Sequence, residues 1–185
     1  MDFPGSYRSR LFTVGHSNRT LEEFLSLLKA YRIETLIDLR TVPRSRYFPH
    51  FNRETLSASL EKVGIDYIHI PKLGGLRKAK KDSVNTGWKN ASFRGFADYM
   101  QTREFEAAVE ELLIRIDQST CAILCAEAVP WKCHRSLVAD ALLVRGASVD
   151  HIMASSRTQS HQLTPFARVS GMRITYPDLL ESEAS

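Results

Sequence analysis

Hydrophobic positions along the chain alternate between short apolar runs and longer segments with helical spacing. Five short runs predict strands, at residues 11–15, 35–39, 66–70, 121–126 and 148–153. Between them, apolar residues recur three or four positions apart, which predicts helices at 20–31, from 52 to just before 64, at 93–100 and 103–117 (one broken helix or two), and at 134–145. We therefore expect a single α/β domain, a Rossmann-like three-layer fold whose mostly parallel sheet of five or six strands carries helices on both faces.

Local signals place the ends of several elements. Thr20 followed by Glu23 is a capping-box pattern, and Gly64 is typical of a residue just beyond a helix. Near the end of the chain, Thr164–Pro165 predicts the start of a further helix, and residues 173–176 predict a last short strand. Residues 1–10 are expected to be a flexible N-terminus, so one domain spans residues 1–185.

A long polar segment interrupts this alternation between residues 71 and 92. It contains three glycines and a run of lysines. Long connections inside a compact domain are usually functional or disordered. We expect residues 76–91 to form a long functional or mobile loop.

Polar and reactive side chains follow the predicted strands, where ligands bind in open α/β sheets. They are His16 and Ser17 after the first strand, Asp38 and Arg40 after the second, Gly74 and Gly75 after the third, and Cys125, Glu127, Cys133, His134 and Arg135 at and after the fourth. Because parallel strands end at one edge of a sheet, these residues are expected to converge on one site.

The catalytic candidates are Glu127, Cys133, His134 and His16. Cys133–Arg135 opens a helix, and cations in a first helical turn favour a bound anion or a Cys133 thiolate. Arg135 and Arg40 are the main candidates for binding an anion, together with Asp38, Ser17, Gly74, Gly75 and Arg94. Structural alternatives stay open: an Asp38–Arg40 ion pair, and a salt bridge from Glu127 to Arg135.

Several motifs together resemble family 488 of the domains of unknown function. They are residues 13–17 (TVGHS), 37–40 (IDLR) followed by Pro43 and Ser45, 73–75 (LGG), 93–100 (FRGFADYM), and 124–127 (LCAE) followed by 133–135 (CHR). The resemblance extends from about residue 11 to residue 153. It implies a single α/β domain and an enzyme, without a substrate.

Composition adds a few constraints. The net charge of +4 permits an anionic ligand without requiring nucleic acid. The three cysteines argue against a disulfide framework, and no apolar run approaches the roughly 20 residues of a membrane helix. Residues 1–10 show no apolar signal-peptide region. We expect a cytoplasmic protein that does not contact a membrane.

Four functions compete at this point. The first is an enzyme, a hydrolase or transferase, acting on a small anionic ligand, a nucleotide or a nucleic-acid end. The second is thiol-redox chemistry at Cys125 and Cys133, and the third is a zinc or iron site made of Cys125, Cys133 and His134. The fourth is a non-catalytic nucleic-acid-binding module. No Walker loop or Rossmann fingerprint is present, so no cofactor is predicted. Oligomeric state has no signal in the sequence.

Overall fold

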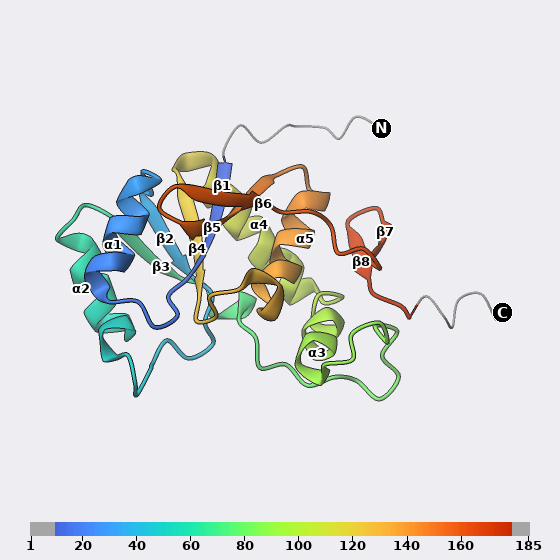
Figure 1. Ribbon diagram of the computed structural model, residues 1–185. Helices are drawn as coiled ribbons and strands as arrows, with labels where there is room; N and C mark the ends of the chain where they lie inside the picture. The colour runs from blue at the N-terminus through green and yellow to red at the C-terminus, as the bar shows by residue number, and fades with distance from the viewer. Residues whose placement is uncertain (1–9, 179–185) are drawn as a thin grey trace.

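A computed structural model describes residues 10–178 and shows one six-stranded sheet at the centre of the molecule (Figure 1). The strands are β1 (Arg10–Gly15), β2 (Thr35–Asp38), β3 (Asp66–His69), β4 (Cys121–Cys125), β5 (Ser148–Ala154) and β6 (Arg157–Ser160). Their order is β3-β2-β4-β1-β5-β6. The first five strands are parallel, as predicted, and β6 adds an antiparallel edge that the sequence pattern did not reveal.

Five helices and three single 3₁₀ turns connect the strands. They are α1 (Leu21–Ala30), α2 (Arg53–Glu61), α3 (Ala91–Tyr99), α4 (Arg103–Gln118) and α5 (Arg135–Val144), with turns at Pro49–Phe51, Pro71–Leu73 and Pro130–Lys132. The predicted broken helix is two helices, because Thr102 caps α4 by accepting a hydrogen bond from the Phe105 amide. None of the helices in the described part of the chain is long and apolar enough to cross a membrane.

Both faces of the sheet are covered by helices, as the α/β pattern predicts. Helices α1 and α2 pack one face through residues such as Phe24 and Leu56, and α4 and α5 pack the other through Leu112 and Leu137 (Figure 1). Successive residues of β4 belong alternately to the two cores, so every residue of this strand is buried. This explains its uninterrupted apolar run.

The predicted start of α1 is confirmed in detail. Thr20 Oγ1 accepts from the Glu23 amide at 3.2 Å, and the Glu23 carboxylate accepts from the Thr20 amide at 2.8 Å. Gly64, beyond α2, has a φ of +73°, a conformation that favours glycine. The predicted flexible N-terminus lies outside the described residues, except that Arg10 already belongs to β1.

The long polar segment is held in place by one buried carboxylate. Asp98 of α3 accepts hydrogen bonds from the Lys80 amide (2.8 Å), Ser83 Oγ (2.5 Å) and Asn85 Nδ2 (2.8 Å). Asn85 in turn accepts from the Tyr176 amide at 2.9 Å. The segment is therefore irregular but tied to α3 and to the end of the chain.

The prediction of a helix starting at Thr164–Pro165 is wrong. Residues 161–167 form an irregular segment with one turn. The Thr164 amide and hydroxyl both donate to Asp140 of α5, so the residue attaches this segment to α5 instead of capping a helix. The predicted last strand is β8 (Arg173–Thr175), which pairs with β7 (Arg168–Ser170) in a separate two-stranded sheet (Figure 1).

Candidate active site

A cavity of about 350 Å³ lies beyond the carboxyl ends of β1, β2 and β4. We call it the thiol cavity. Seven of the residues selected from the sequence line it: His16, Arg40, Gly75, Cys125, Glu127, Cys133 and His134. The topology therefore brings the ends of several strands to one site, as expected for an open α/β sheet.

The two cysteines and a histidine form the floor of this cavity. Cys125 is 1% exposed and Cys133 is 5% exposed. His134 Nε2 lies 3.8 Å from Cys125 Sγ, and its Nδ1 lies 3.8 Å from Cys133 Sγ. The two sulfurs and the histidine ligand atom all lie within 4.8 Å of one another. As predicted, the two thiols are close, and neither forms a disulfide.

The environment separates the acidities of the two thiols. A hydrogen bond from Cys125 lowers the pKa of Cys133 well below its usual value, and His134 and Arg135 add to this effect against the cost of burial. Burial raises the pKa of Cys125 well above its usual value, and the neighbouring Cys133 raises it further. The directions of the two shifts make Cys133 the more acidic thiol of the pair.

His134 is held by its neighbours as well as by the thiols. Its ring packs on Phe96 with centroids 5.0 Å apart. A Cβ added to Gly75 would lie 3.0 Å from His134 Nδ1, so a side chain at position 75 would crowd the imidazole. The glycine at this position keeps the space that the ring occupies.

His16 enters the cavity as a neutral imidazole. It is 4% exposed and stacks on Phe51, with centroids 4.4 Å apart. Burial lowers the pKa of His16 to about 4. Nδ1 lies 2.9 Å from the Ser17 carbonyl, which can only accept, so we assign the proton to Nδ1. Nε2 is then left as a proton acceptor.

Asp38 and Arg40 form the buried ion pair that was one of the two sequence interpretations. Arg40 Nη2 donates to Asp38 Oδ2 at 2.6 Å and to the Phe51 carbonyl at 2.9 Å. Tyr67 donates its hydroxyl to the same carboxylate at 2.7 Å. Arg40 nonetheless lines the cavity, so its charge lies next to any ligand there.

Arg135 does not lie where an anion-binding residue of the cavity would have to lie. The residue is 1% exposed and is not part of the cavity lining. Nη1 donates to the Glu127 carbonyl at 2.5 Å and Nη2 to the Ala128 carbonyl at 2.9 Å, while Nε is buried without a partner among the described residues. Arg135 therefore holds the loop after β4, and it bonds to the backbone of Glu127 instead of its carboxylate.

Two backbone amides near the start of α5 are also not available to an anion. The amides of Cys133 and Ser136 already donate to the carbonyls of Pro130 and Cys133, both at 3.0 Å. Glu127 is exposed at the cavity. The cations that line the cavity are Arg40 and the exposed Arg44.

The remaining sequence candidates support the site or lie away from it. The Ser17 amide donates to the Ala126 carbonyl at 2.8 Å, which ties the loop after β1 to the loop after β4. Gly74 is required by close packing, because a Cβ there would overlap Thr41. Arg94 donates to the Trp88 carbonyl at 3.0 Å and does not line the cavity.

Six further residues line the cavity without having been selected: Thr41, Val42, Arg44, Ser45, Leu76 and Ala126. Arg44 and Ser45 follow β2, so the rule that selected Arg40 would also have found them. Leu76 is 81% exposed and has a φ of +60°, a strained conformation for leucine. No sequence signal marks this residue.

A family model described as "Domain of unknown function DUF488" matches residues 20–142, more than half of the chain. The chain belongs to this family. The DUF488 match includes every thiol-cavity residue except His16. Comparison with curated proteins and with solved structures gives no match.

Proposed function

We propose that this DUF488 protein is an enzyme that acts on a small anionic substrate, with Cys133 as its nucleophile. The observation that carries the proposal is the thiolate pair: Cys133 next to the Cys125 donor and His134, on the floor of a cavity that Arg40 and Arg44 also line. A thiolate at neutral pH is a strong nucleophile, and the guanidinium groups favour a phosphate or carboxylate beside it.

The other cavity residues fit a two-step transfer. Cys133 Sγ would bond to the electrophilic atom of the substrate as the leaving group departs. In the second step, the oxygen of the incoming water or acceptor would bond to the same atom as its bond to Cys133 Sγ breaks, which returns the thiolate. Nε2 of neutral His16 would take the proton of the incoming group, and the exposed carboxylate of Glu127 would relay it to solvent. This makes the protein a hydrolase or transferase, and the substrate a small anionic metabolite, a nucleotide or a nucleic-acid end. The thiols require a reducing compartment such as the cytoplasm.

The exposed apolar side chains at the cavity suggest what surrounds the anionic group. Val42 is 59% exposed and Leu76 is 81% exposed, and both line the cavity. Exposed apolar residues beside a polar pocket are typical of a ligand contact. A substrate with an apolar portion next to its anionic group would cover them.

The reactivity of the thiols tests the proposal. Thiolate absorbance near 240 nm and the rate of iodoacetamide alkylation, read by mass spectrometry, should both titrate at a pH well below the free-cysteine value of about 8.5. Alkylation should occur at Cys133. Cys125→Ser keeps a hydrogen-bond donor, and Cys125→Ala removes it, so the midpoint should rise in Cys125→Ala and rise less or not at all in Cys125→Ser. Cys121, which is buried outside the cavity, is the internal control.

An ordinary midpoint for Cys133, or equal midpoints in the parent and Cys125→Ala, would exclude the thiolate pair. Absorbance does not depend on access of the reagent to the cavity. A slow reaction alone therefore cannot be mistaken for a high pKa.

A metal centre is the second candidate, because Cys125, Cys133 and His134 present three donor atoms within 4.8 Å. Ligand atoms around a tetrahedral zinc lie roughly 3.6 Å apart, given its bond lengths. Here the sulfurs approach different ring nitrogens, each at 3.8 Å, so the imidazole would have to turn to place one nitrogen near both. This favours the thiol function. Stoichiometric zinc or iron in protein purified without added metal, and lost in His134→Ala, would favour the metal centre instead.

A further inference from the structure

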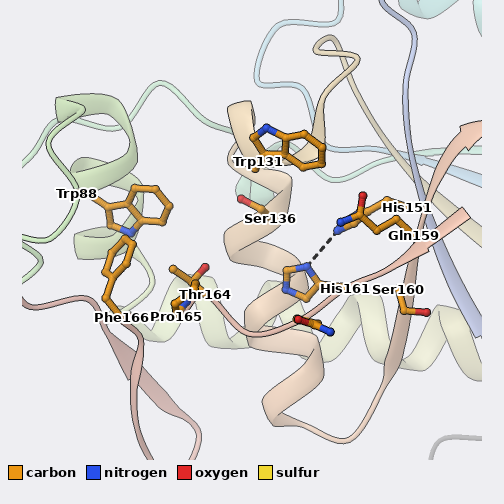
Figure 2. A pocket seen from close by; sticks show the side chains of 11 residues that line it. Trp88, Trp131, Ser136, His151, Gln159, Ser160, His161, Thr164, Pro165 and Phe166 are labelled. Carbon is orange, nitrogen blue, oxygen red and sulfur yellow. Dashed lines mark hydrogen bonds between the residues drawn. The ribbon is translucent and has the colours of Figure 1, made fainter.

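A second cavity, of about 560 Å³, is lined in part by Trp131 from the loop after β4 (Figure 2). We call it the aromatic cavity. It is lined by Trp88 from the long segment, by Trp131, by Ser136 and His151, and by residues between 159 and 166. Both tryptophans of the chain are among them. Trp131 is two residues from Cys133, so the same loop lines both cavities.

One wall of the aromatic cavity is a packed cluster of rings. Trp88 contacts Phe166 edge-on with centroids 5.0 Å apart, and it also contacts Phe93 at 4.7 Å and Tyr176 at 5.6 Å. Trp88 Nε1 is buried without a hydrogen-bond partner among the described residues. Figure 2 shows this nitrogen on the side of Phe166, where the ring face can accept the N–H. The cluster is therefore a fixed platform.

Trp131 forms a different part of the wall. It is 56% exposed, and within residues 10–178 it has no ring contact. An indole that is neither packed in a core nor paired with another ring leaves a large flat surface available to a ligand.

The floor is a chain of buried hydrogen bonds. Thr13 Oγ1 lies 2.7 Å from His151 Nδ1, and His161 Nε2 lies 2.9 Å from Asp140 Oδ1. Between them, His151 Nε2 lies 3.0 Å from His161 Nδ1 (Figure 2). An ionised Asp140 only accepts, so His161 carries its proton on Nε2 and each ring nitrogen is then used once. Burial lowers the pKa of His151 to about 4, in agreement with a neutral ring.

The polar groups that remain for a ligand are uncharged. Gln159 and Gln162 are exposed residues of the lining, and the exposed Ser160 already donates its hydroxyl to Asp150 at 2.7 Å. Among the described residues that line the cavity there is no aspartate, glutamate, lysine or arginine. A charged group would find no counter-ion here, and an aliphatic group would leave the amides unpaired. A neutral planar ring with a polar edge satisfies both the aromatic walls and the glutamine amides.

We propose that the aromatic cavity binds a neutral heteroaromatic ring of the nucleobase type, stacked on Trp131 with its edge toward the glutamine amides. Indole rings stack on every base, and glutamine presents the donor–acceptor pair that matches a base edge. The cavity volume of about 560 Å³ is within the range that is typical of small-molecule binding sites. The same ring could belong to a nucleoside, a nucleotide or an unpaired base of single-stranded nucleic acid. The proposal does not depend on the thiol chemistry.

Intrinsic fluorescence excited near 295 nm tests the proposal directly, because both tryptophans line this cavity. Adenosine, guanosine, cytidine and uridine are titrated into the full chain, and isothermal titration calorimetry gives the affinity independently of the fluorophore. At least one nucleoside should quench the emission in a saturable way. Trp131→Ala should weaken its binding by at least about fivefold, the low end of the stacking contribution of one base, and Trp131→Phe should retain part of it.

Two control variants make the result specific. Ile114→Ala removes an apolar side chain that is 61% exposed on α4, away from the cavity, and should bind like the parent. Cys133→Ser should also bind like the parent, so that failure of the thiol proposal and failure of this one can be told apart. AMP and a short single-stranded oligonucleotide identify the source of the ring: tighter binding of either than of the nucleoside supports the site and names the larger ligand.

The proposal fails if no nucleoside binds up to its limit of solubility, or if Trp131→Ala binds as tightly as the parent. It also fails if a simple sugar or an aliphatic alcohol competes as well as the nucleoside. Unchanged unfolding of Trp131→Ala in urea shows that any loss of binding is local, as expected for a side chain this exposed.

Discussion

The thiol cavity and the aromatic cavity share one loop but are built in different ways. The thiol cavity collects charged and reactive groups from the ends of neighbouring parallel strands, such as Arg40, Cys125 and Glu127. The aromatic cavity has uncharged lining residues that come from segments far apart in sequence, such as Trp88, Trp131 and Phe166. Sheet topology alone explains the first arrangement. The second depends on how irregular segments pack against α5.

The two cavities also differ in how much of each lies within the family match. The matched span, residues 20–142, contains all of the thiol cavity except His16. His151 and the residues from Gln159 to Phe166 lie beyond it. The DUF488 match therefore covers nearly the whole thiol cavity but only a minority of the residues that line the aromatic cavity. The difference teaches that two neighbouring cavities of one domain can be built from different parts of the chain.

Arg135 is the residue whose loss should affect both cavities and have the largest effect. Arg135→Ala removes a fully buried side chain that holds the carbonyls of Glu127 and Ala128. We expect the free energy of unfolding to fall by about 3–5 kcal/mol, the scale for truncating a large buried side chain. Urea denaturation measures it, and Arg103→Ala, an exposed arginine, should change it by less than about 0.5 kcal/mol.

The same variant should raise the pKa of Cys133, because Arg135 is one of the groups that lower it. A folded Arg135→Ala with unchanged stability would show that the shared loop does not need this anchor. The two cavities would then be independent.

A substitution of Asp140, in contrast, should affect the aromatic cavity and leave the thiol cavity unchanged. Its carboxylate accepts from His161 Nε2, Tyr176 Oη and both the amide and hydroxyl of Thr164, below the aromatic cavity. Asp140→Asn replaces an acceptor by a donor, which leaves buried donors unpaired and should destabilise the fold by about 2–3 kcal/mol. Asp117→Asn, on the exposed side of α4, is the matched control.

Nucleoside binding should weaken in Asp140→Asn, while the alkylation midpoint of Cys133 should stay that of the parent. A shifted midpoint would mean that the two sites are coupled through α5.

One buried histidine in each cavity should make stability depend on pH. Burial lowers the pKa of His16 and of His151 from 6.5 to about 4, so the unfolded chain binds more protons than the folded chain between these values. Stability should therefore fall as the pH falls through this window, with the loss complete near the folded pKa. We expect about 1–2 kcal/mol per histidine, below the limit set by the full shift.

Urea denaturation at several pH values across this window measures the effect. His16→Gln and His151→Gln should each remove one part of the dependence. If the free energy of unfolding depends on pH as strongly in the double variant as in the parent, other groups are responsible.

Local signals in the sequence were sufficient for the five parallel strands, the five helices and seven of the residues that line the thiol cavity, but not for β6 or β7. The capping box at Thr20 and the apolar run of β4 depend on neighbouring residues, and the site follows once the strands are parallel. Arg135 could not be assigned from the sequence, because its partners are backbone carbonyls whose direction depends on the loop. Trp88, Trp131 and His161 have no common pattern, since packing alone unites them. The helix predicted to start at Thr164–Pro165 was wrong because a threonine hydroxyl can bond to a distant carboxylate as well as it can cap a helix.

The strand order has a consequence for how the chain is made. Strand β4 lies between β1 and β2, and β1 is flanked by β4 and β5. During synthesis, which adds roughly 5–20 residues per second, β1 therefore has no partner until β4 leaves the ribosome, a delay on the order of ten seconds. In that interval β2 can pair only with β3, and the edges of β1 and β2 that will receive β4 remain open to other chains. The nascent protein should depend on a chaperone until the strand that carries Cys125 arrives.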